Sequence, residues 1–361
     1  MTSKFVYSGT MHFPKNPSIT NVRYEGRNIK FIPYFPSDLK FLEILQTKLQ
    51  YIAEFPKSLK RLRIQWTLLD TLPQLPEGLE ELIIINRQKS FNLTSFPTTL
   101  KKLVIIGSSF VSKDLPPLPL SLEVLIFESY ENHSQVQLNV QNLLNLKKIT
   151  YKLPILSNTY KLILPSNIET VILRGISIEN LPPKIKYLDI QETNTAQLPS
   201  LPPKLKYLNC SINPITVLPS LPKTLEYLNC STTRISEIQL LPKTLTSFRA
   251  FDTPIRFYPE LPLGLKHVSL VNNFTHLMPM LLHSYLLLDN NYEKYNRFIS
   301  TIKMFKAKYK AKILRKEKKE RMGRFIANWI YNQGMKPGGL FAKMAIKRAQ
   351  HNNAKLLELG K

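Results

Sequence analysis

The side chains best suited to chemistry in this sequence are two cysteines, Cys210 and Cys230, which stand twenty residues apart. Two thiols brought together could form a disulfide bond or supply half of a zinc site, which normally needs four ligands. The other candidate zinc ligands are six scattered histidines, His12, His133, His267, His276, His283 and His351. Because no histidine pair lies near the cysteines, we interpret both thiols as small apolar residues of a buried core.

The sequence lacks the motifs that would indicate a reaction. It contains no glycine-rich phosphate loop, no nucleophile elbow and no zinc-binding histidine pair. It therefore predicts a protein that is not an enzyme, with no cofactor, no metal and no small-molecule substrate. Function has to be sought in the elements that carry the cysteines.

Both cysteines belong to an internal repeat. The stretch LPSLPPKLKYLNCSINPITV, residues 198–217, is followed directly by LPSLPKTLEYLNCSTTRISE. Such self-similarity is typical of a solenoid, in which no unit can bury its apolar side without its neighbours. Thirteen units share a first apolar column, formed by Ile19, Leu39, Leu59, Leu79, Leu100, Leu122, Leu146, Ile168, Ile185, Leu205, Leu225, Leu245 and Leu265. Second and third columns follow three and five residues later, for example Leu208 and Cys210 after Leu205.

A spacing of two between the second and third columns predicts one short β-strand in each unit, with both columns on the same face. The recurring LPxLP segment predicts an extended, polyproline-like return path, because proline fixes φ and biases the residue before it to extended backbone. Successive strands should stack in parallel. The predicted fold is a solenoid with parallel strands on one side and proline-rich connections on the other.

The unit Leu205, Leu208, Cys210, Asn213, Ile215, Leu218, Pro219, Leu221 and Pro222 resembles the leucine-rich repeat, in the short LPxLP subclass of bacterial virulence effectors. In composition the chain also resembles leucine-rich-repeat proteins of giant DNA viruses. The resemblance covers about residues 17–280, which leaves residues 1–16 as an N-terminal segment or cap and residues 281–361 as a basic helical tail and cap. It implies that the strands line a concave face that binds a protein partner. Some bacterial relatives carry a ubiquitin-ligase domain with a catalytic cysteine after the repeats, but no cysteine follows Cys230 here.

The units depart from this pattern in two ways. Those that begin at Leu79, Leu100, Leu122, Leu146 and Ile168 are 21, 22, 24, 22 and 17 residues long, which predicts a bend or bulge there. Thr193, Thr233 and Thr253 replace the buried asparagine that the family places between turns. A single hydroxyl can join fewer backbone hydrogen bonds than an amide, so we expect weaker cross-links at these three threonines.

The strand residues between the buried columns should point outward and supply the binding surface. The candidate partner-binding residues are Tyr187, Asp189, Tyr207, Asn209, Tyr227, Asn229 and Arg249. Aromatic and amide side chains give contact area and hydrogen bonds at low entropic cost. Alternatively, the tyrosines only cover the sheet by stacking on one another. Earlier units place Arg61 and Arg63, and then the apolar Ile83, Ile85, Val104 and Ile106, at outward positions, which predicts an exposed apolar stripe that contacts a partner or the tail.

The tail has a different pattern. Tyr295, Phe298, Ile302, Phe305 and Tyr309 recur at spacings of three and four, which predicts an amphipathic helix; a second helix is predicted over residues 340–359. The candidate polyanion-binding residues are Lys303, Lys306, Lys308, Lys310, Lys312, Arg315, Lys316, Lys318, Lys319, Arg321 and Arg324. The tail could cap the last repeat, or its basic face could bind nucleic acid or an anionic membrane surface.

The whole chain has a formal net charge of +25 and a pI near 9.9, which favours acidic partners. Residues 301–361 hold 17 Lys and Arg against 3 Asp and Glu. We find neither a signal sequence nor an apolar run near eighteen residues, so we expect an intracellular protein of the cytoplasm or nucleus. The leading hypothesis is a non-catalytic protein-interaction scaffold, and the alternative is a polyanion-binding protein that acts through the tail.

Overall fold

The computed structural model describes residues 4–7, 19–32, 34–69, 71–86, 93–107, 115–130, 138–255 and 260–269, without the side chains of residues 4, 5 and 155–161. The chain forms two compact units, Met1–Asn213 and Pro214–Lys361. The tail that is predicted to be helical, residues 281–361, lies outside the described residues, and the boundaries 1–16, 17–280 and 281–361 stay predictions.

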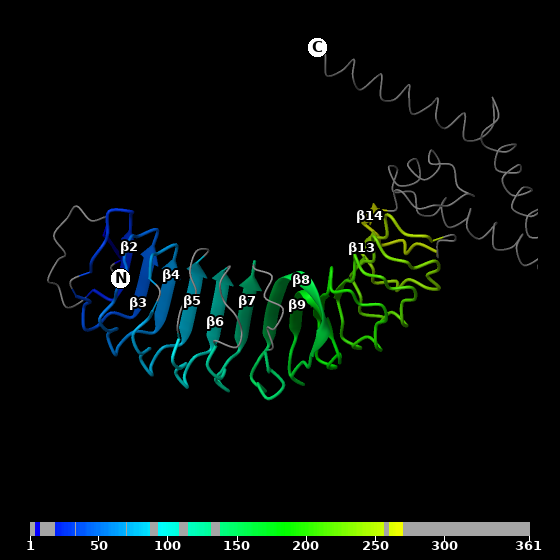
Figure 1. Ribbon diagram of the computed structural model, residues 1–361. Coiled ribbons are helices and arrows are strands. Elements are labelled where there is room, and N and C mark those ends of the chain that lie inside the picture. Colours follow the sequence, from blue (N-terminus) through cyan, green and yellow to red (C-terminus); the bar gives the residue numbers. More distant parts are fainter. Residues whose placement is uncertain are drawn as a thin grey trace, which may run out of the picture. The chain divides into compact units, whose positions relative to one another are not determined.

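Each of these two compact units, which we call the first and the second unit, contains several repeats. Their parallel β-strands lie side by side in the order of the sequence (Figure 1). The first unit contains β1 (Lys4–Tyr7), β2 (Asn21–Glu25), β3 (Phe41–Leu45), β4 (Arg61–Gln65), β5 (Glu81–Asn86), β6 (Lys102–Gly107), β7 (Val124–Ser129), β8 (Lys148–Leu162), β9 (Thr170–Ile178), β10 (Tyr187–Asp189) and β11 (Tyr207–Asn209). The second unit contains β12 (Tyr227–Asn229), β13 (Ser247–Arg249) and β14 (His267–Ser269). Register follows the repeat, so that Leu42 pairs with Leu62 and Phe248 with Val268. The predicted parallel solenoid is confirmed.

The core is built from the three predicted columns. Every first-column residue from Ile19 to Leu265 is buried. The second and third columns are buried as well, from Val22 and Tyr24 up to Phe248 and Ala250. Strand alternation therefore turns both columns inward and leaves the residues between them on the opposite face, as the spacing predicts.

Prolines close the turn that leads into most of the strands. The carbonyl oxygen of a proline in the return path accepts a hydrogen bond from the first-column amide three residues later. Leu59 donates to Pro56 at 3.1 Å, and Leu205 donates to Pro202 at 3.1 Å. This is the hydrogen bond of a β-turn. The described connections contain turns and no helix. A polyproline-like backbone within them stays a prediction.

A recurring left-handed residue ends many of the strands. The residue two positions after the third column has positive φ in units across the repeat, as at Gln46 (53°), Trp66 (53°), Ile212 (55°) and Thr232 (53°). Glycine fills this position only at Gly26 and Gly175 among the described residues with positive φ. A β-branched residue such as Ile212 adopts this conformation at a cost of about 1–3 kcal/mol. The turn is therefore set by the stacking of the units and not by local sequence.

The predicted irregularity lies between β8 and β9. These strands stay in register from Lys148↔Thr170 to Lys152↔Arg174, and the register then shifts between Lys152 and Ser157 and again before Lys161. Extra residues in one strand of a pair bulge away from its partner. The unit of 22 residues and the unit of 17 residues meet here, so their unequal lengths account for the bulge.

Polar side chains link neighbouring turns at the position three residues after the third column. Asn213 is buried and bonds both to its own turn and to the preceding one, whereas Thr233 and Thr253 each bond one carbonyl oxygen, those of Cys230 and Ala250. At the same position, the buried hydroxyls of Thr47 and Thr67 have no hydrogen-bond partner among the described residues. Thr193, the third predicted replacement, bonds the carbonyl oxygen of Ile190 and also contacts Asn213 Oδ1 of the next turn. The expected weaker cross-link therefore does not hold at Thr193.

One strand was not predicted. β1 pairs in parallel with β2, with Phe5 opposite Val22 and Tyr7 opposite Tyr24. The rings of Tyr7 and Tyr24 lie 5.5 Å apart in an edge-to-face arrangement. No LPxLP segment precedes β1, so the repeat pattern gave no sign that a strand pairs with the first repeat.

Candidate functional site

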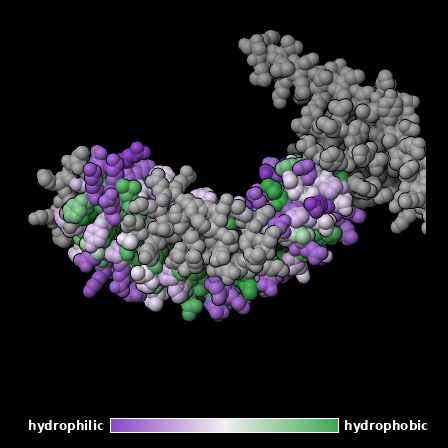
Figure 2. All heavy atoms as spheres, viewed as in Figure 1, coloured by the Kyte–Doolittle hydropathy of each residue, from purple (hydrophilic) through white to green (hydrophobic). Residues whose placement is uncertain are grey.

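The outward residues of the strands form a surface that we call the strand face. Its residues form rows that run across the strands. One row in the first unit consists of Arg23 on β2, Glu43 on β3, Arg63 on β4 and Ile83 on β5. Hydrophilic side chains gather over these N-terminal strands, with a few hydrophobic ones among them (Figure 2). Parallel register places equivalent residues of neighbouring units about 4.8 Å apart, so side chains on this face contact along rows.

Charges alternate along two of these rows. Arg23 Nε lies 2.7 Å from Glu43 Oε2, and the other oxygen of Glu43 lies 3.9 Å from Arg63 Nη1. The hydrogen bond to Glu43 raises the pKa of Arg23. In the second row, Glu81 lies 3.4 Å from Arg61 Nε and 2.6 Å from Lys102 Nζ. Each carboxylate therefore has one close cation and one looser one.

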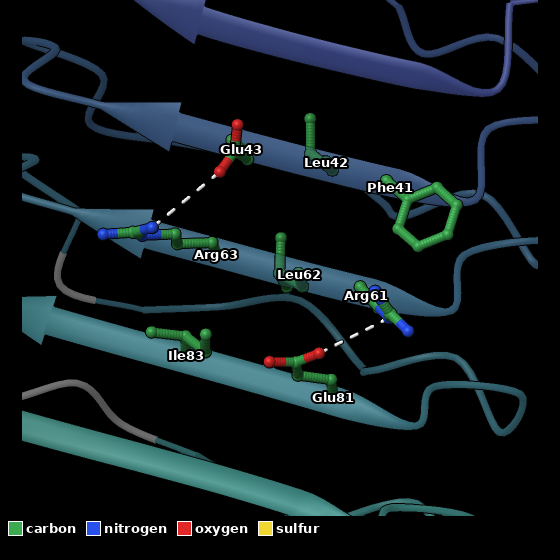
Figure 3. Close-up of a pocket in the computed structure, with 8 residues that line it drawn as sticks. All are labelled: Phe41, Leu42, Glu43, Arg61, Leu62, Arg63, Glu81 and Ile83. Carbon is green, nitrogen blue, oxygen red and sulfur yellow. Dashed lines mark ion pairs between the residues drawn. The ribbon is translucent and has the colours of Figure 1, made fainter. Parts of the chain in front are cut away.

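A cavity opens on the strand face of β3–β5, where these rows run side by side (Figure 3). Its volume is about 260 Å³. The lining residues are Phe41, Leu42, Glu43, Arg61, Leu62, Arg63, Glu81 and Ile83. Arg61 leans toward Glu81 and Arg63 toward Glu43, while Phe41 and Ile83 supply apolar walls. The cavity thus presents two guanidinium groups between apolar and acidic side chains.

The two arginines of the cavity are only partly satisfied. Arg61 has 62% of its side chain exposed, stacks over the Phe41 ring at 5.0 Å, and makes no ion pair among the described residues other than that with Glu81. Arg63 donates from Nη2 to Gln65 Oε1 at 2.8 Å, and its buried Nε has no hydrogen-bond partner in the described part of the chain. Because a guanidinium has five donors, both groups keep capacity for a ligand.

Another row of charges follows the margin of the strand face. Glu80 lies 3.6 Å from Lys60 and 3.4 Å from Lys101. The Lys101 ammonium lowers the pKa of the exposed Glu80 carboxyl. Such exposed pairs contribute little to stability, because water and salt screen them. Their effect is to keep the margin of the face polar.

The tyrosines predicted to bind a partner lie at the C-terminal strands of the first unit and in the second unit. Tyr187 on β10 and Tyr207 on β11 are half-buried and stacked, with ring centroids 4.0 Å apart and planes 8° apart. In the second unit, Tyr227 on β12 lies under the Arg249 guanidinium, 5.9 Å from the ring centroid. Arg249 is exposed. The structure thus brings Tyr187 to Tyr207 and Tyr227 to Arg249.

The polar residues of the next predicted row are buried. Asp189 is 7% exposed and receives two hydrogen-bonded contacts from the Arg174 guanidinium, at 2.8 and 2.9 Å. Asn209 is 5% exposed and accepts a hydrogen bond from Ser211 at 2.7 Å. Asn229 accepts the equivalent bond from Ser231 at 2.7 Å. These three side chains therefore serve first to hold the end of the strand face in place.

The apolar residues predicted to form an exposed stripe are half-buried at Ile83, Ile85 and Ile106, and Val104 is 6% exposed. Parallel pairing sets Ile83 beside Val104 and Ile85 beside Ile106. Packing of these side chains against one another accounts for their reduced exposure. The stripe exists, but it exposes less apolar surface than the sequence indicates.

Both cysteines are free and buried. Cys210 lies in the third column, and burial raises the pKa of its thiol to about 12. A thiol held in its protonated form is a poor nucleophile and a poor metal ligand. The interpretation of the cysteines as core residues is confirmed, and the described residues contain no group of three or more His, Cys, Asp and Glu suited to a metal ion.

A second opening lies on the return paths of the second unit. A groove of about 920 Å³ runs between residues 216–223 and 236–244. Val217 and Leu240, which are 69% and 81% exposed, line it. At these two positions some other units have polar residues, such as Gln197 and Ser220, and others have aromatic ones, such as Phe31 and Tyr51. The sequence pattern therefore did not single out this groove.

The predicted polyanion-binding residues, from Lys303 to Arg324, lie outside the described residues. In the part of the chain that the structure describes, no helix has the length and hydropathy needed to cross a membrane. The cavity residues Phe41, Glu43 and Glu81 were not predicted as site residues. The sequence indicated Glu43 through one feature, which is that Arg23, Glu43 and Arg63 alternate in charge at the repeat interval.

Comparison with known proteins gives structural relatives only. No family model matches the chain, and no curated protein does. A structure of YopM, a leucine-rich effector protein from Yersinia pestis, is 28% identical over 68% of this chain and 69% of its own, with a TM-score of 0.57. YopM from Yersinia enterocolitica WA-314 is 25% identical over 72% of this chain and 70% of its own, with a TM-score of 0.42. CroV588, a circular leucine-rich-repeat protein, is 18% identical over 73% of this chain and 42% of its own, with a TM-score of 0.46.

Proposed function

We propose that this chain, whose fold is similar to that of a leucine-rich effector protein, acts as a non-catalytic scaffold that binds a protein partner through its strand face. The likeness to YopM, a leucine-rich effector protein, supports an interaction function. We also propose that the protein acts inside a cell, since two free thiols fit a reducing compartment.

The observation that carries this proposal is the chemistry of the strand face. Arginine and aromatic side chains of neighbouring strands lie against one another there. Arg61 is opposite Phe41 and stacks over its ring, and Arg249 lies over the ring of its diagonal neighbour Tyr227. Tyrosine and arginine are enriched among the residues that dominate binding energy in protein interfaces. A sheet also holds them more rigidly than a loop would, which lowers the entropic cost of binding.

Within this proposal, the predicted site residues divide into two roles. Tyr187, Tyr207, Tyr227 and Arg249 are partly or fully exposed and would contact the partner directly. Asp189, Asn209 and Asn229 are buried and would position neighbouring side chains, as Asp189 does for Arg174. The first group should therefore respond to substitution through binding, and the second through stability.

Affinity capture from the native cell tests the proposal. With the full-length protein as bait, the double substitution Tyr187→Ala and Tyr207→Ala should reduce the captured partner at least about tenfold, because two central aromatic contacts are lost. Tyr51→Ala is the matched control, since Tyr51 is 68% exposed on a return path, and it should leave capture unchanged. Equal capture by both variants would remove the strand face from consideration.

The second candidate function is polyanion binding by the tail, and it is favoured by the charge of residues 301–361, with 17 basic against 3 acidic residues. The same experiment includes a bait in which Lys306, Lys308, Lys310 and Lys312 are changed to glutamine. If the tail is the binding element, this bait should lose its partner and its salt-sensitive retention on heparin together. If the strand face is the binding element, the partner should be retained while heparin binding weakens.

A further inference from the structure

We infer that the cavity on β3–β5 binds an extended acidic peptide segment of the partner, with two carboxylates at Arg61 and Arg63. This inference rests on the proposed function and names the chemistry of the partner at one site.

The Arg61 guanidinium is the first position at which an anion could bind. The guanidinium carbon lies 5.0 Å from the centre of the Phe41 ring, and Nε pairs with Glu81 at 3.4 Å. Glu81 is held more closely by Lys102, at 2.6 Å. The outer edge of the Arg61 guanidinium, in a side chain that is 62% exposed, is therefore open to a ligand carboxylate in a two-bond arrangement.

Arg63 offers a second position. Its contact with Glu43 Oε1 is 3.9 Å long, beyond hydrogen-bond distance, while Glu43 is held by Arg23 at 2.7 Å. Arg61 and Arg63 are two residues apart on β4, so they point to the same face about 7 Å apart. Alternate residues of an extended peptide have the same spacing, so two acidic residues separated by one position can reach both arginines.

The charge balance favours a peptide over a nucleic acid. The strand face of β2–β6 carries four cations, Arg23, Arg61, Arg63 and Lys102, and three anions, Glu25, Glu43 and Glu81. The small excess of positive charge lies at the two arginines that are least satisfied. A nucleic acid needs a continuous basic surface. An acidic peptide with two carboxylates needs only two separate cations, which Arg61 and Arg63 supply.

Fluorescence anisotropy with the full-length protein tests the inference. The probe is a fluorescein-labelled peptide, Gly-Glu-Leu-Glu-Leu-Gly, and the control probe carries glutamine in place of both glutamates. Relative to the wild-type protein, the double substitution Arg61→Gln and Arg63→Gln should raise the Kd of the acidic probe at least about tenfold, through two lost charge-assisted contacts. The glutamine probe should bind the wild-type protein at least about tenfold more weakly than the acidic probe.

Two further variants separate a binding effect from a general loss of charge or of folding. Lys147→Gln removes an exposed cation that pairs with Glu123 outside the cavity, and it should leave the Kd unchanged. Glu81→Gln releases Arg61 from its internal carboxylate and should lower the Kd about threefold, a gain that a misfolded protein could not show.

An unchanged Kd in the double arginine variant, or equal binding of the two probes, would overturn the inference. A single-stranded oligonucleotide should also be tested. If the double arginine variant raises its Kd as much as it is expected to raise that of the acidic probe, the cavity binds nucleic acid and the inference is wrong. If either occurs while the double tyrosine variant still loses its captured partner, the scaffold proposal stands and only the acidic-peptide site is wrong.

Discussion

Replacement of Asn213 by alanine should lower the free energy of unfolding by about 4 kcal/mol, because several buried backbone groups would lose their partners together. The Asn213 amide nitrogen lies 2.8 Å from the carbonyl oxygen of Ile190, 3.1 Å from that of Cys210 and 3.0 Å from that of Ser211. Its carbonyl oxygen accepts hydrogen bonds from the amides of Thr193 and Thr195, at 3.1 and 2.9 Å. Alanine replaces none of these bonds.

Urea unfolding followed by circular dichroism measures this effect. Thr253→Val is the matched control, because Thr253 is at the equivalent position and its hydroxyl bonds the Ala250 carbonyl oxygen at 3.0 Å, and it should cost only about 1 kcal/mol. If Asn213→Ala and Thr253→Val shift the midpoint equally, the amide does not link the turns as the structure indicates.

Phe127→Ala should have a similarly large effect, a loss of about 3–5 kcal/mol. Phe127 is fully buried in the third column, and its ring lies 5.5 Å from that of Tyr151 at an interplanar angle of 70°. Truncation removes this edge-to-face contact and leaves a cavity between two units that the rigid stack cannot close.

The same unfolding measurement tests this prediction, with Leu144→Ala as control. Leu144 lies in the same unit of the chain and is 58% exposed, so its truncation should change the free energy of unfolding by less than about 0.5 kcal/mol. A midpoint for Phe127→Ala that equals the wild-type value would show that the third column is not a continuous core.

The architecture could be predicted because one sequence interval fixes three structural quantities at once. When Leu42 and Leu62 occupy equivalent places, the same offset sets the strand length, the parallel register and the side that is buried. The prolines could be assigned to the return path for the same reason. Features that a single unit does not encode were missed, such as β1, which pairs with β2 without an LPxLP segment before it.

The candidate site was less predictable than the fold. Alternation placed Asp189 and Asn209 on the strand face, but their side chains are short and bend back to Arg174, and to Ser211 beside the left-handed residue Ile212. Their burial therefore depends on the local backbone conformation. That conformation could not be predicted from residue type, because the left-handed position holds isoleucine and not glycine. The open side of Arg61 depends on Glu81 lying closer to Lys102 than to Arg61. These two distances are set by side-chain geometry between neighbouring strands, which the sequence pattern does not encode.

Photo-crosslinking from two tyrosine positions in the first unit tests most directly whether the strand face binds the partner. Tyr207 lies on the strand face, and Tyr51 lies on a return path. Each is replaced in turn by p-benzoylphenylalanine in the full-length protein, which is irradiated in the native cell. We expect a crosslinked protein partner from position 207 and none from position 51. A partner crosslinked from position 51 and not from position 207 would contradict the proposed function.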